Sequence, residues 1–363
     1  MRYLFDIGHP AEFHYFKHVM GELKKRGHDI VITARDKDVC LYLLADSGFE
    51  YINTGKNISS RVGKVFTLFR NDFKILAVAR KFKPDLVVNF LSPFAAHAAK
   101  LLGKPVIGFH DTESAGVSVA LAKPFTDLIV VPDYYTKRLS GTKEIRFKGY
   151  FGLNYLAPKY FSPDPSIKKL LGVSPEEKYM VLRFVSHRAI HDLGARGLSM
   201  ETKRAAVKEF SKLAKVFISS EVELPADLKK FEIKVPPDRI HHALYHAGLI
   251  WGDSATMSAE GAVLGTPAVF VDKRGRGYTF ELEKKYGLVF NFSDDAADQN
   301  RAIAKGKEIL QRGIDHARWS KNRARLLSEN IDSAAWMVWL IENYPESVKK
   351  IKNEPDLQHR FRL

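Results

Sequence analysis

The sequence is poor in cysteine and in long apolar runs. Cys40 is the only cysteine among the 363 residues, so no disulfide can form within the chain. A single cysteine is typical of a reducing compartment, and we expect a cytoplasmic location. No apolar run approaches the roughly 20 residues of a membrane-spanning helix, and the first residues lack the apolar region and cleavage site of a signal peptide. These absences favour a globular protein over a secreted or membrane-spanning one.

Other absences narrow the class of function. No internal repeat or low-complexity tract interrupts the sequence. No G-x-G-x-x-G run follows a strand candidate, which leaves no case for a nicotinamide cofactor, and we predict no tightly bound cofactor. The acids and histidines between residues 6 and 14 could be drawn as a metal cluster, but they show no ligand geometry, and we predict no metal.

Acidic residues are fewer than basic ones. The 57 lysines and arginines exceed the 42 acids and give a net charge of +15, which would attract nucleic acid, an anionic membrane surface or a phosphorylated substrate. The basic residues are mostly dispersed among acids without an RNA-binding motif, so we predict no specific nucleic-acid partner. The densest basic region, residues 61–83, also carries aromatics. It is typical of a helix packed on its own domain, or of one at lipid head groups of a membrane that the protein would contact peripherally.

What the sequence does contain is a regular alternation of strand and helix candidates, the α/β pattern. Apolar strand candidates of the first half cover residues 3–6, 29–33, 49–53, 86–89, 106–109 and 128–131. Those of the second half cover residues 179–184, 216–219, 249–251, 268–271 and 289–292. Short apolar strands separated by helices predict parallel sheets covered on both faces. We therefore predict two Rossmann-like, doubly wound α/β domains.

The length and a change in composition suggest where these domains begin and end. A chain of this length favours two domains. Glycines at 149 and 152, followed by three prolines up to residue 165, predict the linker between them. We expect an N-terminal domain over residues 1–152, a C-terminal domain over 166–330, and a tail over 331–363 that starts with an amphipathic helix.

The most informative motif runs from Gly252 to Pro267, between two strand candidates. Its position predicts a strand-to-helix turn with a helix that begins near Ser254 or Thr256. Free amides at a helix N-terminus attract phosphate oxygens, and the two hydroxyls can add hydrogen bonds. Glu260 would lie one turn deeper on the same face, where a carboxylate can bind a ribose diol. The motif favours a nucleotide diphosphate, although a plain N-capped helix with a solvated Glu260 gives the same pattern.

Two constellations follow strand candidates of the N-terminal half. After the first strand, Gly8 supplies flexibility, and His9 or His14 could take a proton near neutral pH. Asp111 and Glu113 follow a later strand, where crowded carboxylates shift their pKa values and permit acid-base chemistry. In the alternative interpretation the histidines only bind backbone groups, Asp111 caps a helix, and Glu113 favours the positive end of that helix.

Two cationic groups follow strands of the C-terminal half. His187 and Arg188 come after its first strand and could neutralise a diphosphate. Arg274 and Arg276 belong to a glycine-containing loop that could close over substrate phosphates or form a solvated turn. We expect His241 and its neighbouring histidines to be ordinary helix residues.

Together these motifs resemble GT-B nucleotide-sugar enzymes, notably UDP-N-acetylglucosamine 2-epimerases and the muramyl-lipid N-acetylglucosaminyltransferase. Asp253-Ser254-Ala255-Thr256, Glu260 and Gly265-Thr266-Pro267 carry the resemblance, which covers nearly the whole order of elements. It implies two domains that face a cleft and a last helix that crosses back onto the N-terminal domain. It also implies that Ser254, Ala255 and Thr256 hold the diphosphate and that Glu260 holds the ribose. The sequence is most similar to an uncharacterised GT-B-like family that shares the Asp-x-Gly-His-Pro start and the Asp-Thr-Glu segment.

The sequence departs from the epimerases at reactive positions. Ala255 and Thr256 replace the usual pair of glycines, and Asp111 stands where the epimerases have a histidine. The strand over residues 86–89 is followed by Ser92 but by no carboxylate, whereas the epimerases have an acid there. These departures weaken an epimerase function.

We therefore predict a glycosyltransferase that takes a UDP-sugar as substrate and transfers the sugar to an unknown acceptor, which could be lipid-linked. The Ser254 turn, with His187 and Arg188, would stabilise the departing UDP, and His14, Asp111 or Glu113 would activate the acceptor hydroxyl. A UDP-N-acetylglucosamine 2-epimerase is one alternative. A non-catalytic protein that binds nucleotide, RNA or lipid is another. The base, the sugar, the stereochemistry and the oligomeric state stay open.

Overall fold

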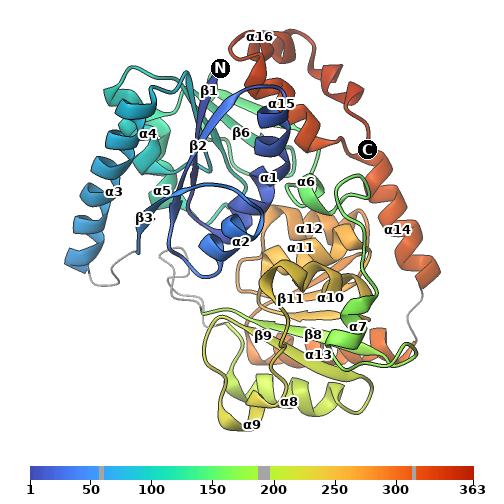
Figure 1. Ribbon diagram of the computed structural model, residues 1–363. Coiled ribbons are helices and arrows are strands. Elements are labelled where there is room, and N and C mark those ends of the chain that lie inside the picture. The colour runs from blue at the N-terminus through green and yellow to red at the C-terminus, as the bar shows by residue number, and fades with distance from the viewer. Residues whose placement is uncertain (57–60, 187–196, 313–315) are drawn as a thin grey trace. The chain divides into compact units, whose positions relative to one another are not determined.

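The computed structural model describes residues 1–56, 61–186, 197–312 and 316–363, of which residues 61–69 and 316 are described by their backbone only. The chain forms two compact units (Figure 1). Unit 1 combines Met1–Tyr155 with Asn330–Arg362, and unit 2 is Leu156–Glu329. Each unit is built on one parallel sheet.

Unit 1 has a seven-stranded sheet in the order β3-β2-β1-β4-β5-β6-β7, in which all neighbouring pairs are parallel. The chain builds outward from β1 to β3 and then returns to the other side of β1 with β4, so the sheet is doubly wound as predicted. The strands are β1 (Arg2–Ile7), β2 (Asp29–Arg35), β3 (Ile52–Gly55), β4 (Leu86–Asn89), β5 (Val106–Phe109), β6 (Leu128–Pro132) and β7 (Glu144–Phe147).

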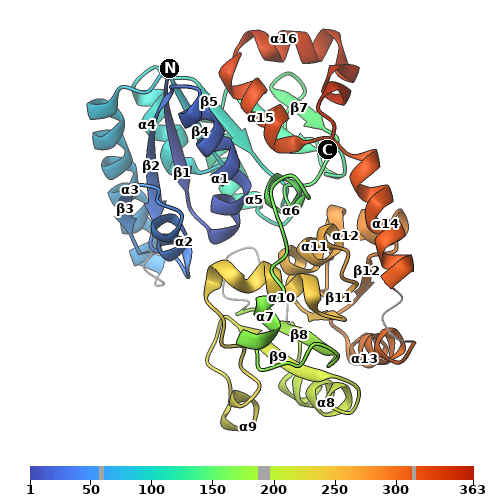
Figure 2. The same ribbon diagram turned by 45° about the vertical axis from the view of Figure 1, so that its right-hand side comes forward.

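Helices cover both faces of this sheet, because successive strand side chains point into two separate apolar cores. Leu4 and Val87 pack with Phe94 in the core beneath α3 and α4. On the other face, the ring of Phe5 lies 5.6 Å from that of Phe16 on α1. Figure 2 shows α3 and α4 on one side of the sheet and α1 on the other. The helices are α1 (Pro10–Lys25), α2 (Cys40–Asp46), α3 (Arg61–Phe82), α4 (Pro93–Leu101), α5 (Gly116–Ala122), α6 (Leu153–Leu156), α15 (Ser333–Glu342) and α16 (Glu346–Asn353).

The C-terminal helix α15 returns to unit 1 and packs on α1. Trp336 is fully buried and stacks on Phe147 of β7, with ring centroids 5.2 Å apart. At the solvent side, Glu342 accepts hydrogen bonds from Arg26 Nη1 at 2.8 Å and from His28 Nε2 at 2.9 Å. The predicted return of the last long helix to the N-terminal half is therefore confirmed.

Unit 2 has a five-stranded parallel sheet in the order β12-β11-β10-β8-β9. The first strand of the unit, β8, is flanked by β9 on one side and by β10 to β12 on the other, so this sheet too is doubly wound. The strands are β8 (Tyr179–Phe184), β9 (Lys215–Ser220), β10 (Ile250–Gly252), β11 (Ala268–Val271) and β12 (Val289–Phe292).

Strand β10 shows how helices cover this sheet. The fully buried indole of Trp251 donates from Nε1 to the carbonyl of Ala302 on α13 at 3.1 Å and lies against Phe210 of α8. Its neighbour Ile250 faces α11, where a Cβ on Gly261 would lie only 2.5 Å from Ile250 Cδ1. The helices are α7 (Ser166–Leu170), α8 (Met200–Phe210), α9 (Ala226–Lys229), α10 (Ile240–His246), α11 (Ala255–Leu264), α12 (Gly277–Lys284), α13 (Ala296–Gln311) and α14 (His316–Glu329).

A few elements differ from the sequence prediction. The edge strand β7 was not predicted, because it has only four residues and alternates charged with apolar side chains. Strand β3 begins at Ile52 rather than at residue 49, and α12 takes up the last residues of the predicted basic loop. Over the described residues, no helix combines the length and the apolar character that a membrane crossing requires.

Candidate functional site

In unit 2 the strand order reverses between β8 and β10. Ligands of open α/β sheets bind in the crevice between the loops that leave such neighbouring strands. Asp253, which is 4 % exposed, joins the two loops. Its Oδ1 accepts a hydrogen bond from the Val185 N–H at 2.8 Å, and its own N–H donates to the Arg183 carbonyl at 3.2 Å. Asp253 therefore fixes the start of both loops relative to each other.

The turn after β10 begins helix α11, which confirms the predicted helix start. Ser254 has an extended backbone, and its Oγ accepts a hydrogen bond from the Met257 N–H at 3.3 Å. The backbone N–H groups of Ala255 and Thr256 belong to the first turn and have no partner within the helix. The Thr256 hydroxyl makes no hydrogen bond to any described residue, and its side chain is partly exposed. An anion at this turn would meet backbone donors, a hydroxyl and the positive end of a ten-residue helix.

Gly252 makes this close arrangement of β8 and β10 possible. Its φ angle is +155°, and a Cβ at this position would lie 2.0 Å from the Arg183 carbonyl oxygen. A residue with a side chain cannot adopt this conformation without moving the backbone of β8. The site therefore depends on a glycine that the sequence motif already contains.

Glu260 lies on α11, four residues after Thr256, and is 7 % exposed. Its Oε1 is 3.0 Å from Nε2 of His241 on α10, and both side chains are buried. A buried carboxylate requires a hydrogen-bonding partner of this kind. His241 lies on helix α10 as predicted, and its ring in addition contacts the Glu260 carboxylate, which the sequence did not indicate.

Asp272 organises the loop after β11. Its Oδ1 accepts hydrogen bonds from the backbone N–H groups of Arg274 and Gly275 at 2.8 and 3.0 Å and from Arg276 Nη1 at 3.3 Å. Arg276 Nη1 also donates to the Gly275 carbonyl at 2.7 Å, so its guanidinium stabilises the loop itself. Arg274 is exposed. Of the two arginines predicted for a phosphate loop, Arg274 is the one whose side chain lies at the surface.

The predicted diphosphate-binding pair, His187 and Arg188, lies outside the described residues. The described part of this loop ends at Ser186, whose N–H donates to Glu221 Oε2 at 3.1 Å. Glu221 Oε1 also accepts a hydrogen bond from Arg183 Nη2 at 2.6 Å. The charge of Arg183 at the end of β8 is therefore balanced by Glu221.

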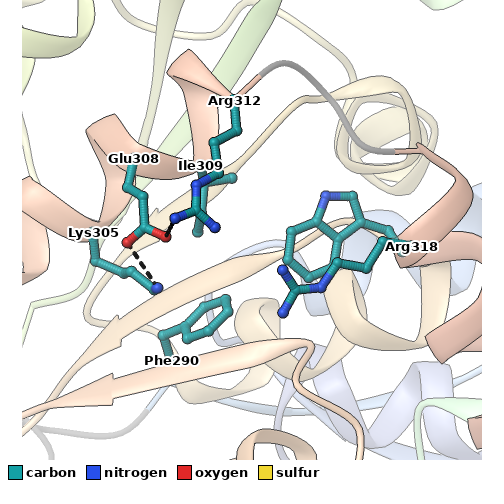
Figure 3. A pocket seen from close by; sticks show the side chains of 7 residues that line it. Phe290, Lys305, Glu308, Ile309, Arg312 and Arg318 are labelled. Carbon is teal, nitrogen blue, oxygen red and sulfur yellow. Dashed lines mark hydrogen bonds and ion pairs between the residues drawn. The ribbon is translucent and has the colours of Figure 1, made fainter.

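Two surface pockets of unit 2 lie away from these loops. One, of about 480 Å³, is lined by Phe290, Lys305, Glu308, Ile309, Arg312, Arg318 and Trp319 (Figure 3). Glu308 forms ion pairs with Lys305 at 2.9 Å and with Arg312 at 3.2 Å. Helix α13 starts after the carboxyl end of β12 and runs antiparallel to this strand. Its last turns, which line the pocket, therefore lie at the amino-terminal edge of the sheet. The second, of about 630 Å³, lies around residues 165–175. Neither contains a predicted site residue.

In unit 1 the strand order reverses between β1 and β4. Asp6 and Asn89 are paired in register at the carboxyl ends of these strands and are 1 % and 0 % exposed. Asp6 Oδ1 accepts a hydrogen bond from Thr33 Oγ1 at 2.8 Å, and Asn89 Oδ1 accepts one from the Ser92 N–H at 2.9 Å. Asp6 Oδ2, Asn89 Nδ2 and Ser92 Oγ are buried and make no hydrogen bond to a described residue. Such atoms are rare in native proteins, and this edge of the sheet has three of them.

Next to this pair, Glu12 and Arg35 flank Gly8. Glu12 Oε2 accepts a hydrogen bond from the Gly8 N–H at 2.6 Å. A Cβ on Gly8 would lie 1.6 Å from Arg35 Nη2, so Gly8 provides space for this guanidinium. The guanidinium also lies over the Phe94 ring, 5.3 Å from its centre. Burial raises the pKa of Glu12 to about 7, although Arg35 and the Gly8 N–H act in the opposite direction.

The two predicted histidines of this region make different contacts. His9 caps α1, because its Nδ1 accepts a hydrogen bond from the Ala11 N–H at 3.1 Å. His14 is 8 % exposed, and its ring stacks on Tyr155 with centroids 5.0 Å apart. His9 therefore lies at the start of the helix, whereas His14 belongs to the packed interior.

Asp111 and Glu113 follow β5, the strand beside β4. Asp111 is 6 % exposed, and its Oδ1 accepts a hydrogen bond from Thr112 Oγ1 at 2.9 Å. Glu113 Oε1 lies 3.4 Å from both the N–H and the Oγ1 of Thr136, in the loop after β6. Burial lowers the pKa of the adjacent His110 to about 4, so its ring is neutral at pH 7. The two acids thus contact different loops.

The sequence prediction missed the position of Arg35 and gave Glu12 only a place in a hypothetical metal cluster. Arg35 is the last residue of β2, and no local pattern indicates that it reaches Gly8 after β1. The contact exists because β1 and β2 are neighbours in the sheet. Within the described ranges, no three metal-ligating side chains gather into a metal site.

The sequence matches a family model and a relative that are both of unknown function. Residues 2–275 match the family model described as "Protein of unknown function (DUF354)". The uncharacterized protein MJ0665 of Methanocaldococcus jannaschii is 24 % identical over 279 residues, which are 73 % of this chain and 80 % of that protein.

Solved structures match over almost the whole chain. The UDP-GlcNAc 2-epimerase from Neisseria meningitidis bound to UDP-GlcNAc has a TM-score of 0.65 and 14 % identity, over 96 % of this chain and 100 % of that one. The glycosyltransferase SsfS6 of Streptomyces sp. SF2575 has a TM-score of 0.58 and 14 % identity, over 94 % and 100 %. At such identities the likeness shows the fold alone, which is the predicted GT-B fold.

Proposed function

The chain belongs to the DUF354 family of proteins of unknown function, and we propose that it is a GT-B-type enzyme that binds a UDP-sugar and transfers the sugar to an acceptor. Unit 2 would bind the nucleotide, and unit 1 would supply acid-base groups. The UDP-sugar would be the substrate, and no tightly bound cofactor would be required. A lipid-linked acceptor would bring the protein to an anionic membrane surface.

The turn from Gly252 to Thr256 is the observation that carries this proposal. It lies at the reversal of strand order in unit 2, where ligands of such sheets bind. It offers the first-turn amides of α11 and the Thr256 hydroxyl to an anion. Asp253, the one carboxylate of the turn, accepts the Val185 N–H with its Oδ1. The turn therefore suits the pyrophosphate of a nucleotide sugar.

The other predicted residues of unit 2 would complete the nucleotide site. Glu260 would bind the ribose hydroxyls, with His241 fixing its carboxylate. His187, Arg188 and Arg274 would add positive charge near the phosphates.

In the transfer, the acceptor oxygen forms a bond to the anomeric carbon while the bond from that carbon to the diphosphate breaks. UDP leaves with the electron pair, and the positive end of α11 stabilises its charge. The acceptor proton would pass to a group of unit 1, for which His9, His14, Asp111 and Glu113 are the sequence candidates.

Ligand-dependent thermal unfolding tests the proposal. A ligand that binds only the folded state raises the melting temperature, by an amount that corresponds to about 2.7 kcal/mol at 100 times its Kd. We expect UDP and UDP-N-acetylglucosamine to raise the melting temperature, with ADP and GDP at the same concentration as comparison. The proposal would be wrong if no nucleotide or nucleotide sugar had an effect.

A matched pair of threonine variants locates the site. Thr256→Val removes a hydroxyl that makes no hydrogen bond to a described residue, so we expect the fold to persist and UDP affinity to fall about tenfold. Thr202→Val makes the same change in the first turn of α8, where Thr202 hydrogen-bonds with Ser199. UDP affinity should be unchanged in Thr202→Val, and an equal loss in both variants would contradict the assignment.

Comparison of UDP with 2′-deoxy-UDP tests the role of Glu260. Wild type should prefer UDP, because a carboxylate that binds the ribose diol loses one hydroxyl partner in the deoxy nucleotide. Glu260→Gln keeps an oxygen that can accept from His241, and it should lower this preference without unfolding α11. If the variant preferred UDP over 2′-deoxy-UDP as strongly as wild type does, Glu260 would not bind the ribose and would serve only as the partner of His241.

A UDP-N-acetylglucosamine 2-epimerase is the second candidate, and the structural match to such an epimerase favours it. Asn89 and Ser92 at the end of β4 speak against it, because no carboxylate stands there. Incubation with UDP-N-acetylglucosamine alone separates the two. An epimerase would invert the sugar at C2 without an acceptor, and would release UDP only if water then took the sugar, whereas a transferase would leave the substrate intact until an acceptor is added.

A further inference from the structure

Arg35 is a cation whose charge acts on the nearby Glu12 carboxylate without pairing with it directly. It makes no hydrogen bond or ion pair with a described residue, and its Nε is buried without a partner. Its guanidinium is fixed between the Gly8 backbone and the Phe94 ring. An arginine normally uses its planar fork of donors for a carboxylate or phosphate. In the described part of the chain, contacts with Gly8 and Phe94, and no hydrogen bond, hold the Arg35 guanidinium in place.

The surroundings of Arg35 are polar and contain a group that titrates near neutral pH. Glu12 binds the Gly8 N–H with Oε2, and its Oε1 has no hydrogen bond to a described residue. The charged groups that act on Glu12 are Arg35 and Lys37, which favour its ionised form, and Asp6, which opposes it. Cys40 also lies nearby, and burial raises the pKa of its thiol to about 12, which leaves it neutral. His9 begins the same helix.

The carboxyl ends of β1 and β4 offer hydrogen-bond donors and acceptors that have no partner among the described residues. Asp6 Oδ2, Asn89 Nδ2 and Ser92 Oγ are buried at the ends of β1 and β4 without partners. They lie at the reversal of strand order, the position at which a sheet of this kind receives a ligand. Arg35 ends the neighbouring strand β2, and a cation together with these unused polar groups suits a small polar molecule with an anionic group.

We propose that the carboxyl edge of the unit 1 sheet is a second ligand site, in which Arg35 binds the phosphate or carboxylate of a small polar ligand and Glu12 controls its affinity. Ionised Glu12 competes for Arg35 and repels the anion, whereas protonated Glu12 does neither. The site stands independently of the proposed transfer reaction. In a transferase its ligand would be an anionic acceptor.

Sulfate titration tests the anion site, because sulfate keeps its charge from pH 5.5 to 8.5. The protein is first saturated with UDP, so that sulfate does not report on α11. We expect Arg35→Gln to weaken sulfate binding at least tenfold, as the loss of a charge-assisted contact requires. Arg26→Gln is the matched control, since Arg26 already pairs with Glu22 and Glu342, and it should bind like wild type.

The outcomes separate this site from the proposed function. Equal sulfate affinity in wild type and Arg35→Gln, or no sulfate binding by wild type, would overturn the site whether or not UDP binds. If UDP does not bind, the nucleotide proposal fails, and the same titration without UDP still tests Arg35.

Glu12 supplies a second readout. Wild-type affinity for sulfate should rise as the pH falls from 8.5 to 5.5, with a midpoint near 7. Glu12→Gln keeps an acceptor for the Gly8 N–H and should bind at pH 8.5 as tightly as wild type binds at pH 5.5. Glu22→Gln, an exposed change on the same helix, should keep the wild-type profile. A full wild-type slope in Glu12→Gln would exclude the proposed role of Glu12.

Discussion

Both the close packing of β8 and β10 and the candidate nucleotide site require a glycine at position 252. We expect Gly252→Ala to destabilise the protein by about 3 kcal/mol or more, because its Cβ would overlap the Arg183 carbonyl of β8. Urea unfolding followed by tryptophan fluorescence measures the change. Gly21→Ala on α1 is the control, since a Cβ there meets nothing and a helical alanine is favoured over glycine by about 0.5–1 kcal/mol. Wild-type stability in Gly252→Ala would contradict the close approach of β8 and β10.

Glu12 predicts a specific pH dependence of stability. Its pKa is about 7 in the folded protein and 4.5 is its ordinary value, so the folded state binds the proton more tightly. The stabilising effect of the proton is complete below pH 4.5 and is lost as the pH rises through 7. Between pH 5 and 8, wild type should therefore lose stability relative to Glu12→Gln, as measured by urea midpoints. A constant difference between the two proteins would show that the Glu12 pKa is not raised.

Local sequence predicts some site residues and not others. Ser254 follows an apolar strand and precedes a helical run, and such a hydroxyl is a good helix cap, so its role could be predicted. The pairing of Glu260 with His241 and the contact of Arg35 with Gly8 join residues of different elements. Those contacts follow from how helices and strands pack, which no local pattern encodes.

At the scale of elements, Asn154 connects three helices of unit 1. Its Nδ2 donates to the Tyr15 carbonyl of α1 at 2.9 Å, and its Oδ1 accepts a hydrogen bond from Ser333 Oγ of α15. Asn154→Ala removes both buried hydrogen bonds that join α1 and α15 through this side chain and should destabilise unit 1 by about 2–4 kcal/mol. Asn353→Ala, an exposed change on α16, should stay within about 0.5 kcal/mol in the same urea experiment. Equal stabilities of the two variants would mean that α15 is not held through Asn154.

The elements that the sequence predicted well are those with strong apolar patterns and clear ends. Strands β8 and β11 match their predicted ranges because they are apolar runs buried in the sheet. Helix α12 was missed because the glycines and arginines before it favour a loop, in which Asp272 and Arg276 shape the turn that leads into the helix. The winding of both sheets followed from the alternation of elements, since parallel strands need crossover connections of one hand.

For the whole molecule, the net charge of +15 favours anionic ligands in general. The two candidate sites would each bind an anion, but with different groups. In unit 2 an anion would meet helix amides, whereas in unit 1 it would meet a single guanidinium. Many of the other basic residues pair with acids at the surface, as Arg204 does with Asp227. Specific binding of an anion would therefore depend on the two candidate sites more than on the overall charge.

Hydrogen exchange can separate the two sites within one protein. UDP should slow the exchange of backbone amides at residues 253–257, because phosphate oxygens would bond to the first turn of α11. It should leave the amides of residues 6–12 unchanged. Sulfate added to the UDP complex should then slow exchange around Gly8 in wild type, and this second effect should vanish in Arg35→Gln. Protection by UDP around Gly8 and not at α11 would reverse the assignment of the two units. Mass spectrometry of peptides from each region measures both effects in a single titration, with peptides of α8 as the internal reference.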